Sequence, residues 1–210
     1  MKTIKDECTG QIVVKKSRFI ATMRPVANRE QAESFVAEIK KKYWDARHNC
    51  SAYILPPSHE QGEYVHSSDD GEPSGTAGKP MLTMLQARGL SGVAVVVTRY
   101  FGGVLLGTGG LVRAYQDAVT AAMDAADIVE EIMMRTLRVT VDYTLIGRLQ
   151  AYVASREGVF SREASYEDKV IFPILVPLES EKEIRDELVE ITNGKALIED
   201  GGTSKEEIMT

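Results

Sequence analysis

Two polar, glycine-containing segments on either side of one apolar stretch hold most of the residues in this chain that could bind an anion. The first covers residues 67–79, the apolar stretch covers 93–100, and the second covers 101–110 and leads into a predicted helix. Glycine costs backbone entropy on folding, so such segments indicate positive φ angles or close backbone approach. Because folding rarely needs two of them around one strand, they are the strongest indication of function.

The start of that helix supplies the first part of a predicted anion site. Thr108, Gly109 and Gly110 come directly before a helix that is expected to begin at Leu111. The first N–H groups of a helix lack partners inside the helix and carry partial positive charge, which favours anions. Arg113 falls in the first turn, where a cation is unfavourable by about 0.3–1 kcal/mol unless an anion or a carboxylate lies nearby.

A second part of the site is expected at the end of the apolar strand. Arg99 leaves the carboxyl end of that strand, the edge where α/β sites tend to collect. The predicted anion- or nucleic-acid-binding residues, which offer cationic side chains or accessible backbone N–H groups, are Arg47, His48, Lys79, Arg99, Gly102, Gly103, Gly107, Thr108, Gly109, Gly110 and Arg113. An alternative stays open, in which Arg99 and Arg113 pair with nearby carboxylates and merely fix the first loop.

Familiar phosphate-binding motifs are absent from both segments. The sequence GTAGKP at 75–80 has two residues between its glycines, and a proline follows the lysine. A Walker motif needs four residues there and a Ser or Thr after the lysine. The second segment lacks the third glycine of a dinucleotide fingerprint, which would stand at Val112. Nucleotide binding by either of these motifs is therefore not expected.

Acidic, histidine and tryptophan side chains near these segments have competing interpretations. Asp69, Asp70 and Glu72 are weak candidate ligands for a hard cation, but aspartates stabilise turns equally well. We therefore predict no metal and no cofactor. His48 precedes a predicted strand and could act as an acid, a base or an anion donor, although a structural hydrogen bond is the expected role. We place Trp44 in the core, with stacking on a nucleobase as the alternative.

Composition indicates a globular protein with an uneven charge distribution. The 210 residues fit one large domain or two small ones, and no apolar run is long enough to cross a membrane. Only Cys8 and Cys50 are present, and no secretion signal is visible, so we expect a reduced, cytoplasmic protein. The net charge of −6 disfavours indiscriminate binding of polyanions. Residues 1–58 nevertheless carry eleven basic and six acidic residues, which leaves room for a local basic face.

Hydrophobic periodicity predicts helices and strands in two successive domains, 1–134 and 135–210, with a boundary near 131–135. The first contains an extended segment at 11–26, a helix capped by Asn28, a strand at 49–55, a long loop at 58–79, a helix at 80–89, a strand at 93–100 buried on both faces and a helix at 111–126. The second contains a strand at 136–141, a helix at 144–156, a hairpin at 159–177, a helix at 180–192, a strand at 195–198 and a frayed tail from 201. Its order, β-α-β-β-α-β, is the ferredoxin-like arrangement.

Several strings of the chain closely resemble the YigZ/IMPACT family. They are KSRFI at 16–20, DARHNC at 45–50, SDDGEPSGTAG at 68–78, VTRYFGG at 97–103 and GTGGLVRAY at 107–115. The resemblance implies an N-terminal α+β domain of the type found in ribosomal proteins, domain IV of elongation factor G and small-molecule kinases. It also implies a ferredoxin-like C-terminal domain similar to the last domain of elongation factor G. Eukaryotic relatives are associated with translational control under amino-acid starvation through a protein partner, and bacterial relatives are suggested to bind nucleic acid.

Three functions are therefore compatible with the sequence. The leading one is a non-catalytic RNA- or ribosome-associated protein, linked to translation regulation or stress response, that binds an anionic ligand at its glycine-rich loops. The first alternative is an enzyme acting on a phosphorylated small molecule, with His48, Asp69 and Asp70 as acid–base groups. The second is a protein-interaction adaptor in translational control. We predict no catalytic residues, RNA or the ribosome as the partner, a possible protein partner and no membrane.

Overall fold

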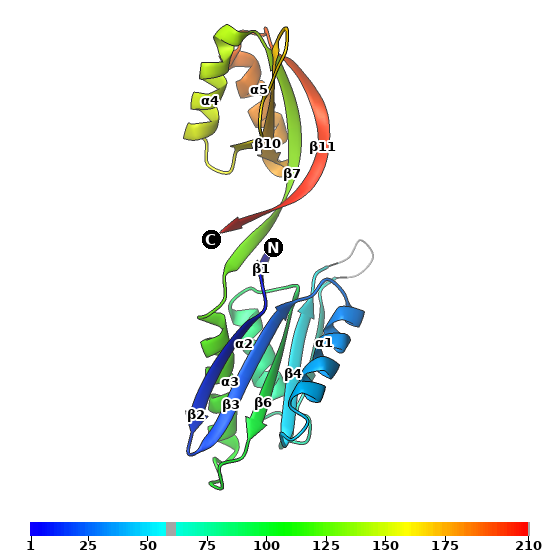
Figure 1. Cartoon of the computed structure of the whole chain (residues 1–210), viewed down its shortest axis with the longest axis vertical. Coiled ribbons are helices and arrows are strands. Elements are labelled where there is room, and N and C mark those ends of the chain that lie inside the picture. Colours follow the sequence, from blue (N-terminus) through cyan, green and yellow to red (C-terminus); the bar gives the residue numbers. More distant parts are fainter. Residues whose placement is uncertain (58–61, 210) are drawn as a thin grey trace. The chain divides into compact units, whose positions relative to one another are not determined.

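The computed structural model describes residues 1–57 and 62–209 and has two compact units (Figure 1). Unit 1 comprises Met1–Glu130 together with Met209, and unit 2 comprises Glu131–Ile208. Both combine helices with strands, in agreement with the predicted α+β class. The division predicted after residue 134 lies inside strand β7 (Ile128–Val141). In the described residues, no helix is long and apolar enough to cross a membrane.

Unit 1 is a five-stranded antiparallel sheet between two helical layers (Figure 1). The strands lie in the order β2 (Cys8–Val14), β3 (Ser17–Pro25), β6 (Val93–Tyr100), β4 (His48–Leu55) and β5 (Tyr64–Ser68). Helix α1 (Arg29–Lys42) covers one face, while α2 (Gly78–Ala87) and α3 (Thr108–Met123) cover the other. The short strand β1 (Lys2–Ile4) pairs with the first residues of β7.

Strand β6 is the centre of this unit, and its predicted burial on both faces is confirmed. Val93, Val95 and Val97 pack into the cluster that includes α2 and α3, whereas Ala94 and Val96 pack against the α1 side. Successive side chains of a strand point to opposite faces, so a continuous run of small and β-branched residues suits a strand covered on both. Its end at Tyr100 leads directly into the second glycine-rich loop.

Three predicted elements of unit 1 need correction. The extended segment 11–26 is a hairpin, because Lys15 and Lys16 form a two-residue turn with φ of 44° and 67°. The long loop contains β5, which pairs with β4, and its residues 58–61 lie outside the described part. Helix α3 begins at Thr108 instead of Leu111, after Gly107 with φ of 73°. The glycines of its first turn therefore belong to the helix.

Unit 2 follows the predicted element order. Its strands lie in the order β11 (Leu197–Met209), β7, β10 (Val170–Pro177), with the short strands β8 (Phe160–Ser161) and β9 (Ser165–Tyr166) pairing with β10. Helices α4 (Ile146–Ser155) and α5 (Glu181–Ile191) follow the short helices Tyr143–Leu145 and Leu178–Ser180, and they contribute Leu149, Ile184 and Leu188 to the core of this unit. The predicted frayed tail is wrong, because β11 continues to Met209. The ferredoxin-like assignment stays a prediction.

Candidate anion-binding site

Asp69 fixes the start of α2. Its carboxylate accepts hydrogen bonds from the backbone N–H groups of Gly75, Ala77 and Gly78 at 2.8, 3.0 and 2.9 Å. Burial tends to raise the pKa of Asp69, but these three donors outweigh it and the pKa is lowered. The carboxylate therefore stabilises unpaired N–H groups around a helix start that has no cap from its own N-cap side chain.

Asp70 connects the first glycine-rich loop to α1 and β4. It accepts a hydrogen bond from Lys40 Nζ at 2.6 Å and another from the backbone N–H of Asn49 at 2.8 Å. Burial opposes ionisation, yet these bonds lower the pKa of Asp70. Both aspartates are thus engaged in positioning the loop. Among the described residues, no group of three or more His, Cys, Asp or Glu side chains is placed to hold a metal ion.

Glu72 and Arg99 form a buried ion pair. They are 7% and 6% exposed, and Arg99 Nη1 lies 2.5 Å from Glu72 Oε1. The same oxygen accepts a hydrogen bond from the Tyr115 hydroxyl at 2.8 Å, and Cys50 Sγ lies 3.3 Å from that hydroxyl. Burial raises the pKa of both Tyr115 and Cys50, the latter to about 12. The alternative in which an arginine fixes the loop through a carboxylate therefore holds for Arg99, which is not an exposed phosphate ligand.

Arg113 differs from Arg99. It is exposed on α3, and it forms no ion pair with any described residue. Arg99 itself keeps one unmet need, because its buried Nε has no hydrogen-bond partner in the described structure. A buried donor without a partner costs about 1–3 kcal/mol. Among the buried side-chain nitrogen and oxygen atoms of unit 1 in the described residues, Arg99 Nε is the one without a hydrogen-bond partner.

His48 is held in one orientation at the start of β4. Its Nδ1 lies 2.9 Å from the backbone oxygen of Asp70. A carbonyl oxygen only accepts, so Nδ1 carries the hydrogen. Nε2 lies 4.0 Å from Glu72 Oε1 and has no hydrogen-bond partner among the described residues. The expected structural role of His48 is present, and one ring nitrogen remains available for a ligand.

A hollow of about 420 Å³ brings part of the predicted site together. Five predicted residues line it, namely Arg47, His48, Arg99, Gly107 and Thr108. Glu72, which the sequence indicated only as a weak metal ligand, also lines it. Apolar residues that sequence reasoning did not assign complete the wall, namely Pro73, Phe101, Leu105, Leu106 and Leu111. The signal that could have found Phe101 and Leu105 is their position next to glycines of the second loop, since Phe101 precedes Gly102 and Leu105 lies between Gly103 and Gly107.

The other predicted residues do not line this hollow. Gly109, Gly110 and Arg113 lie farther along α3, and Lys79 is exposed in the first turn of α2. Gly102 has a structural reason to be glycine, because a Cβ there would lie 2.1 Å from the backbone carbon of Lys16. Gly103 has a φ of 84°, which favours glycine without implying a ligand.

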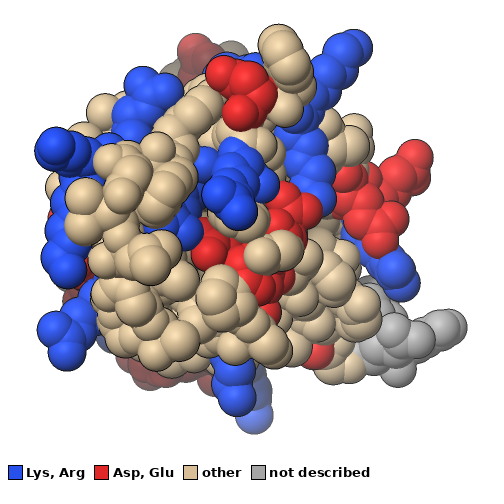
Figure 2. Space-filling view, turned by 90° about the horizontal axis from the view of Figure 1, so that it is seen from below, with Lys and Arg blue, Asp and Glu red and all other residues tan. Residues whose placement is uncertain are grey.

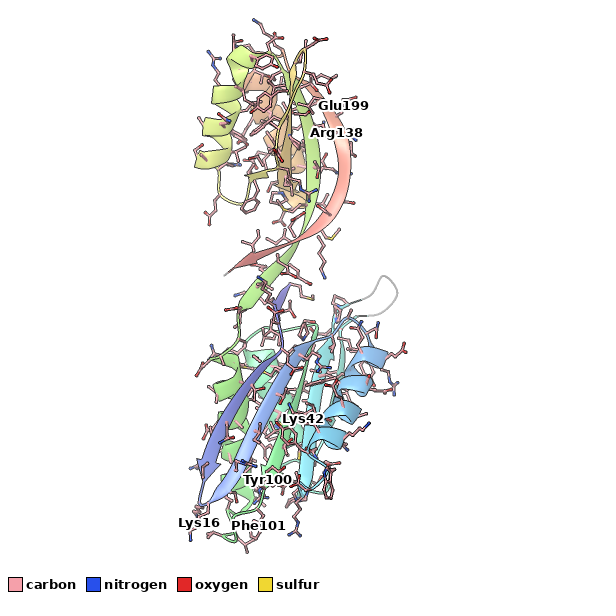
Figure 3. The ribbon with its side chains drawn as sticks, viewed as in Figure 1. Lys16, Lys42, Tyr100, Phe101, Arg138 and Glu199 are labelled. Atoms are coloured by element: carbon pink, nitrogen blue, oxygen red, sulfur yellow. The ribbon has the colours of Figure 1, made fainter. Side chains whose placement is uncertain are left out.

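The hollow opens near one end of the unit 1 sheet, which we call the Tyr100 end. Here the β2–β3 turn, the start of β4 and the end of β6 meet, since Arg18 is paired with Tyr100 and His48 with Arg99. Figure 3 shows Lys16 and Phe101 together at this end. Figure 2 views the molecule from this end and shows Lys and Arg side chains at the edge and near the middle of this face, with carboxylates between them.

Exposed rings accompany these cations. Trp44 is 82% exposed and Phe101 is 42% exposed, so the predicted core position of Trp44 is wrong. Trp44 lies between the end of α1 and the start of β4, in a segment that is neither helix nor strand. The Arg18 guanidinium lies over the Tyr100 ring at 4.5 Å, and the Tyr100 hydroxyl donates to Asp45 at 2.8 Å. The base-stacking alternative for Trp44 therefore remains open.

Comparison with known proteins identifies the family. The model of the IMPACT N-terminal domain matches residues 15–123, and the model of a domain of unknown function matches residues 139–195. The chain belongs to the IMPACT family. It is 40% identical to IMPACT family member YvyE of Bacillus subtilis (strain 168) over 200 residues, which cover 95% of this chain and 90% of that protein.

Two further matches extend over most of the chain. IMPACT family member YigZ of Escherichia coli (strain K12) is 33% identical over 181 residues, which cover 86% of this chain and 88% of that protein. A solved structure described as a hypothetical protein has 31% identity and a TM-score of 0.58, and the match covers 94% of this chain and 95% of that one. The family expected from the sequence strings is thus confirmed for both parts of the chain.

Proposed function

We propose that this IMPACT family protein is a non-catalytic RNA- or ribosome-associated protein linked to translation regulation or stress response, and that it binds RNA at the Tyr100 end of unit 1. Family membership supports the link to translation, because eukaryotic relatives are associated with translational control. The observation that carries the RNA proposal is the combination of unpaired cations and exposed rings at one end of one sheet.

The cations at this end are available to phosphates. Lys15, Lys16 and Arg47 are exposed, and none forms an ion pair with a described residue. Proteins that bind single-stranded nucleic acids combine such cations, which contact the backbone, with aromatic side chains on which bases stack. Trp44 and Phe101 supply the rings. The negative net charge of the whole chain disfavours binding elsewhere, so contact is expected to be restricted to this end.

The test is filter binding of single-stranded segments of ribosomal RNA at increasing salt concentration. Each phosphate contact on a single strand contributes about −0.7 to the log–log salt slope, so contacts by Lys15, Lys16 and Arg47 predict a slope near −2. Replacing the turn with Lys15→Asn and Lys16→Gly removes two charges, and Asn-Gly is the preferred pair for a turn with positive φ at both positions. The slope should then approach −0.7 while the hairpin stays intact.

Two further variants separate stacking from charge. Trp44→Ala should weaken RNA binding by about 1–3 kcal/mol and leave the salt slope unchanged, because it removes a ring and no charge. Arg88→Ala is the matched control. Arg88 is an exposed arginine that precedes the first residue of β6, whereas the Tyr100 end lies at the last residue of that strand. The proposal is contradicted if the protein does not bind RNA or if binding does not depend on salt. It is also contradicted if Arg88→Ala weakens RNA binding as much as the double variant of the Lys15–Lys16 turn does.

A further inference from the structure

The hollow at the Tyr100 end is lined by two kinds of residue. Arg47, His48, Arg99 and Thr108 offer charge or hydrogen bonds, whereas Phe101 and its leucine neighbours are apolar. A volume of about 420 Å³ falls within the roughly 300–1,000 Å³ that is typical of small-molecule sites. Such sites combine an apolar wall with a few converging polar groups, which is the composition found here.

Two features of the hollow leave hydrogen-bond donors without partners in the described structure. Helix α3 begins at Thr108 with no side-chain cap, so no capping side chain accepts hydrogen bonds from its first N–H groups. These groups form the positive end of the helix dipole. Arg99, which is 94% buried because only 6% of it is exposed, lines the same hollow with an Nε that has no partner in the described structure. Arg99 Nε is shielded from solvent, so a ligand in the hollow would first meet the start of α3 and the exposed side chain of Arg47.

The charge of the hollow favours an anion. Glu72 neutralises Arg99 through their contact at 2.5 Å, and Tyr115 donates to the same carboxylate oxygen. Arg47 is then the unbalanced charge of the lining, and the positive end of α3 adds to it. His48 can contribute a further contact as an acceptor, because its Nδ1 donates to Asp70 and Nε2 of the neutral ring could accept from a hydroxyl of the ligand. A phosphate group with acceptor oxygens suits this arrangement better than a carboxylate, because it can accept from several of these donors at once.

The apolar part of the lining indicates what the phosphate is attached to. Phe101 is 42% exposed and Leu105 is 82% exposed, so both present apolar surface that the folded chain leaves uncovered. A flat nucleobase would cover the Phe101 ring, and base–aromatic stacking contributes about 1–3 kcal/mol. We propose that the hollow binds one nucleoside monophosphate unit, free or at the end of an RNA strand, with its phosphate toward Thr108 and Arg47 and its base against Phe101. The RNA-end form rests on the proposed function, whereas the free-nucleotide form does not.

The experiment is isothermal titration calorimetry of the full chain with nucleoside monophosphates, and with inorganic phosphate and unphosphorylated nucleosides as separate probes. We expect the monophosphates to bind at least about tenfold more tightly than either probe, because stacking and phosphate contacts add. Arg47→Ala should weaken binding of both the monophosphates and inorganic phosphate by about tenfold or more, as expected for a lost charge-assisted hydrogen bond. Phe101→Ala should weaken the monophosphates by about tenfold and leave inorganic phosphate unchanged.

Arg113→Ala is the matched control, because Arg113 is exposed on α3, the helix whose first residue lines the hollow, but does not line the hollow itself. All three substituted side chains lie at the surface, and circular dichroism would verify that each variant is folded. Equal affinity for monophosphate and inorganic phosphate, together with no effect of Phe101→Ala, would overturn the nucleoside part. Equal losses from Arg113→Ala and Arg47→Ala would overturn the assignment to this hollow.

Three RNA oligonucleotides distinguish a free nucleotide from an RNA end as the ligand. One ends in a 5′-phosphate, one ends in a 3′-phosphate and one has hydroxyl groups at both ends. Tighter binding of one phosphate-ended strand, lost in Phe101→Ala, supports an RNA end. A free nucleotide is supported if the protein shows no preference among the strands and the double variant Lys15→Asn with Lys16→Gly binds free monophosphates as tightly as the native protein. No binding of any monophosphate at about 10 mM overturns the inference, while salt-dependent RNA binding through the lysine turn would still support the proposed function. Monophosphate binding without RNA binding would support the inference and contradict the proposed function.

Discussion

The buried ion pair between Glu72 and Arg99 allows a quantitative test of how the hollow is built. Arg99→Met would remove the cation from the Glu72 carboxylate, which is 7% exposed in the native chain, and leave the Tyr115 hydroxyl as its hydrogen-bond donor with His48 Nε2 4.0 Å away. Removing one member of a buried ion pair costs about 3–5 kcal/mol, because the other charge stays buried. Glu72→Met should cost a similar amount, since it leaves the Arg99 guanidinium unpaired. Against a typical unfolding free energy of about 5–15 kcal/mol, each loss is large.

The double variant separates pairing from mere burial. Glu72→Met with Arg99→Met removes both charges and leaves the Tyr115 hydroxyl without its acceptor, which costs about 1–3 kcal/mol. We therefore expect the double variant to be more stable than either single variant. Urea unfolding gives the free energies from the midpoint and the slope. Hydrogen exchange of peptides from β6 assigns the transition to unit 1.

Additive losses of unfolding free energy in the double variant would refute this reasoning. If the double variant loses about 6–10 kcal/mol, which is twice the loss of one partner, the two side chains contribute independently. If Arg99→Met costs less than about 1 kcal/mol, the guanidinium is paired no better than an exposed one.

The loops and the core of unit 1 provide three more tests. Asp69→Ala should destabilise unit 1 more than Asp69→Asn, because an amide keeps one acceptor oxygen. The lowered pKa of Asp69 stabilises the folded state above the ordinary aspartate pKa near 4, and this stability is lost as the pH falls below that value. Urea unfolding between pH 5 and pH 2 should show this loss, and Asp69→Asn should flatten the pH dependence. Gly102→Ala should lower the melting temperature, since its Cβ would meet the Lys16 backbone at 2.1 Å, whereas Gly109→Ala, with no atom within 4 Å, should be neutral or stabilising; a reversed order in thermal unfolding would contradict the packing. Native Cys50 should resist iodoacetamide at pH 8, because it is buried and its pKa is raised to about 12, and modification detected by mass spectrometry before unfolding would argue against this burial.

Local signals in the sequence are sufficient for several elements. The β-branched run predicts β6 with its observed bounds, and Asn28 is expected as a helix cap because its short side chain can accept from the backbone. The structure has Asn28 Oδ1 accepting from the Gln31 N–H at 3.0 Å. In each case the cause of the structure lies within a few residues of the effect, which is the range over which a single sequence is informative.

The missed elements have causes that lie outside the local sequence. Lys15 and Lys16 adopt positive φ although the favoured residues for such a turn are Asn and Gly, so nothing indicates a hairpin. Strand β11 continues through exposed polar residues because its backbone pairs with β7, and backbone hydrogen bonds leave no mark on side-chain composition.

The site shows the same limit. Arg47, His48, Arg99 and Thr108 are expected from the sequence to act together, and they do line one hollow. Whether Arg99 faces solvent or a carboxylate depends on Glu72, which is 27 residues away and is brought near by the fold of the first loop. The apolar wall is not predicted, because an exposed Phe101 is recognised only once its surroundings are known.

The thiol of Cys50 gives this protein a natural spectroscopic reporter. Its Sγ lies 3.0 Å from the Asp69 carbonyl oxygen and 3.3 Å from the Tyr115 hydroxyl, which in turn donates to Glu72. The S–H stretching vibration absorbs infrared light in a window where water and amide groups are nearly transparent, and its frequency follows the strength of the hydrogen bond that the thiol donates. Infrared difference spectra could therefore detect occupancy of the neighbouring hollow in unlabelled protein, with Cys8 as an internal reference.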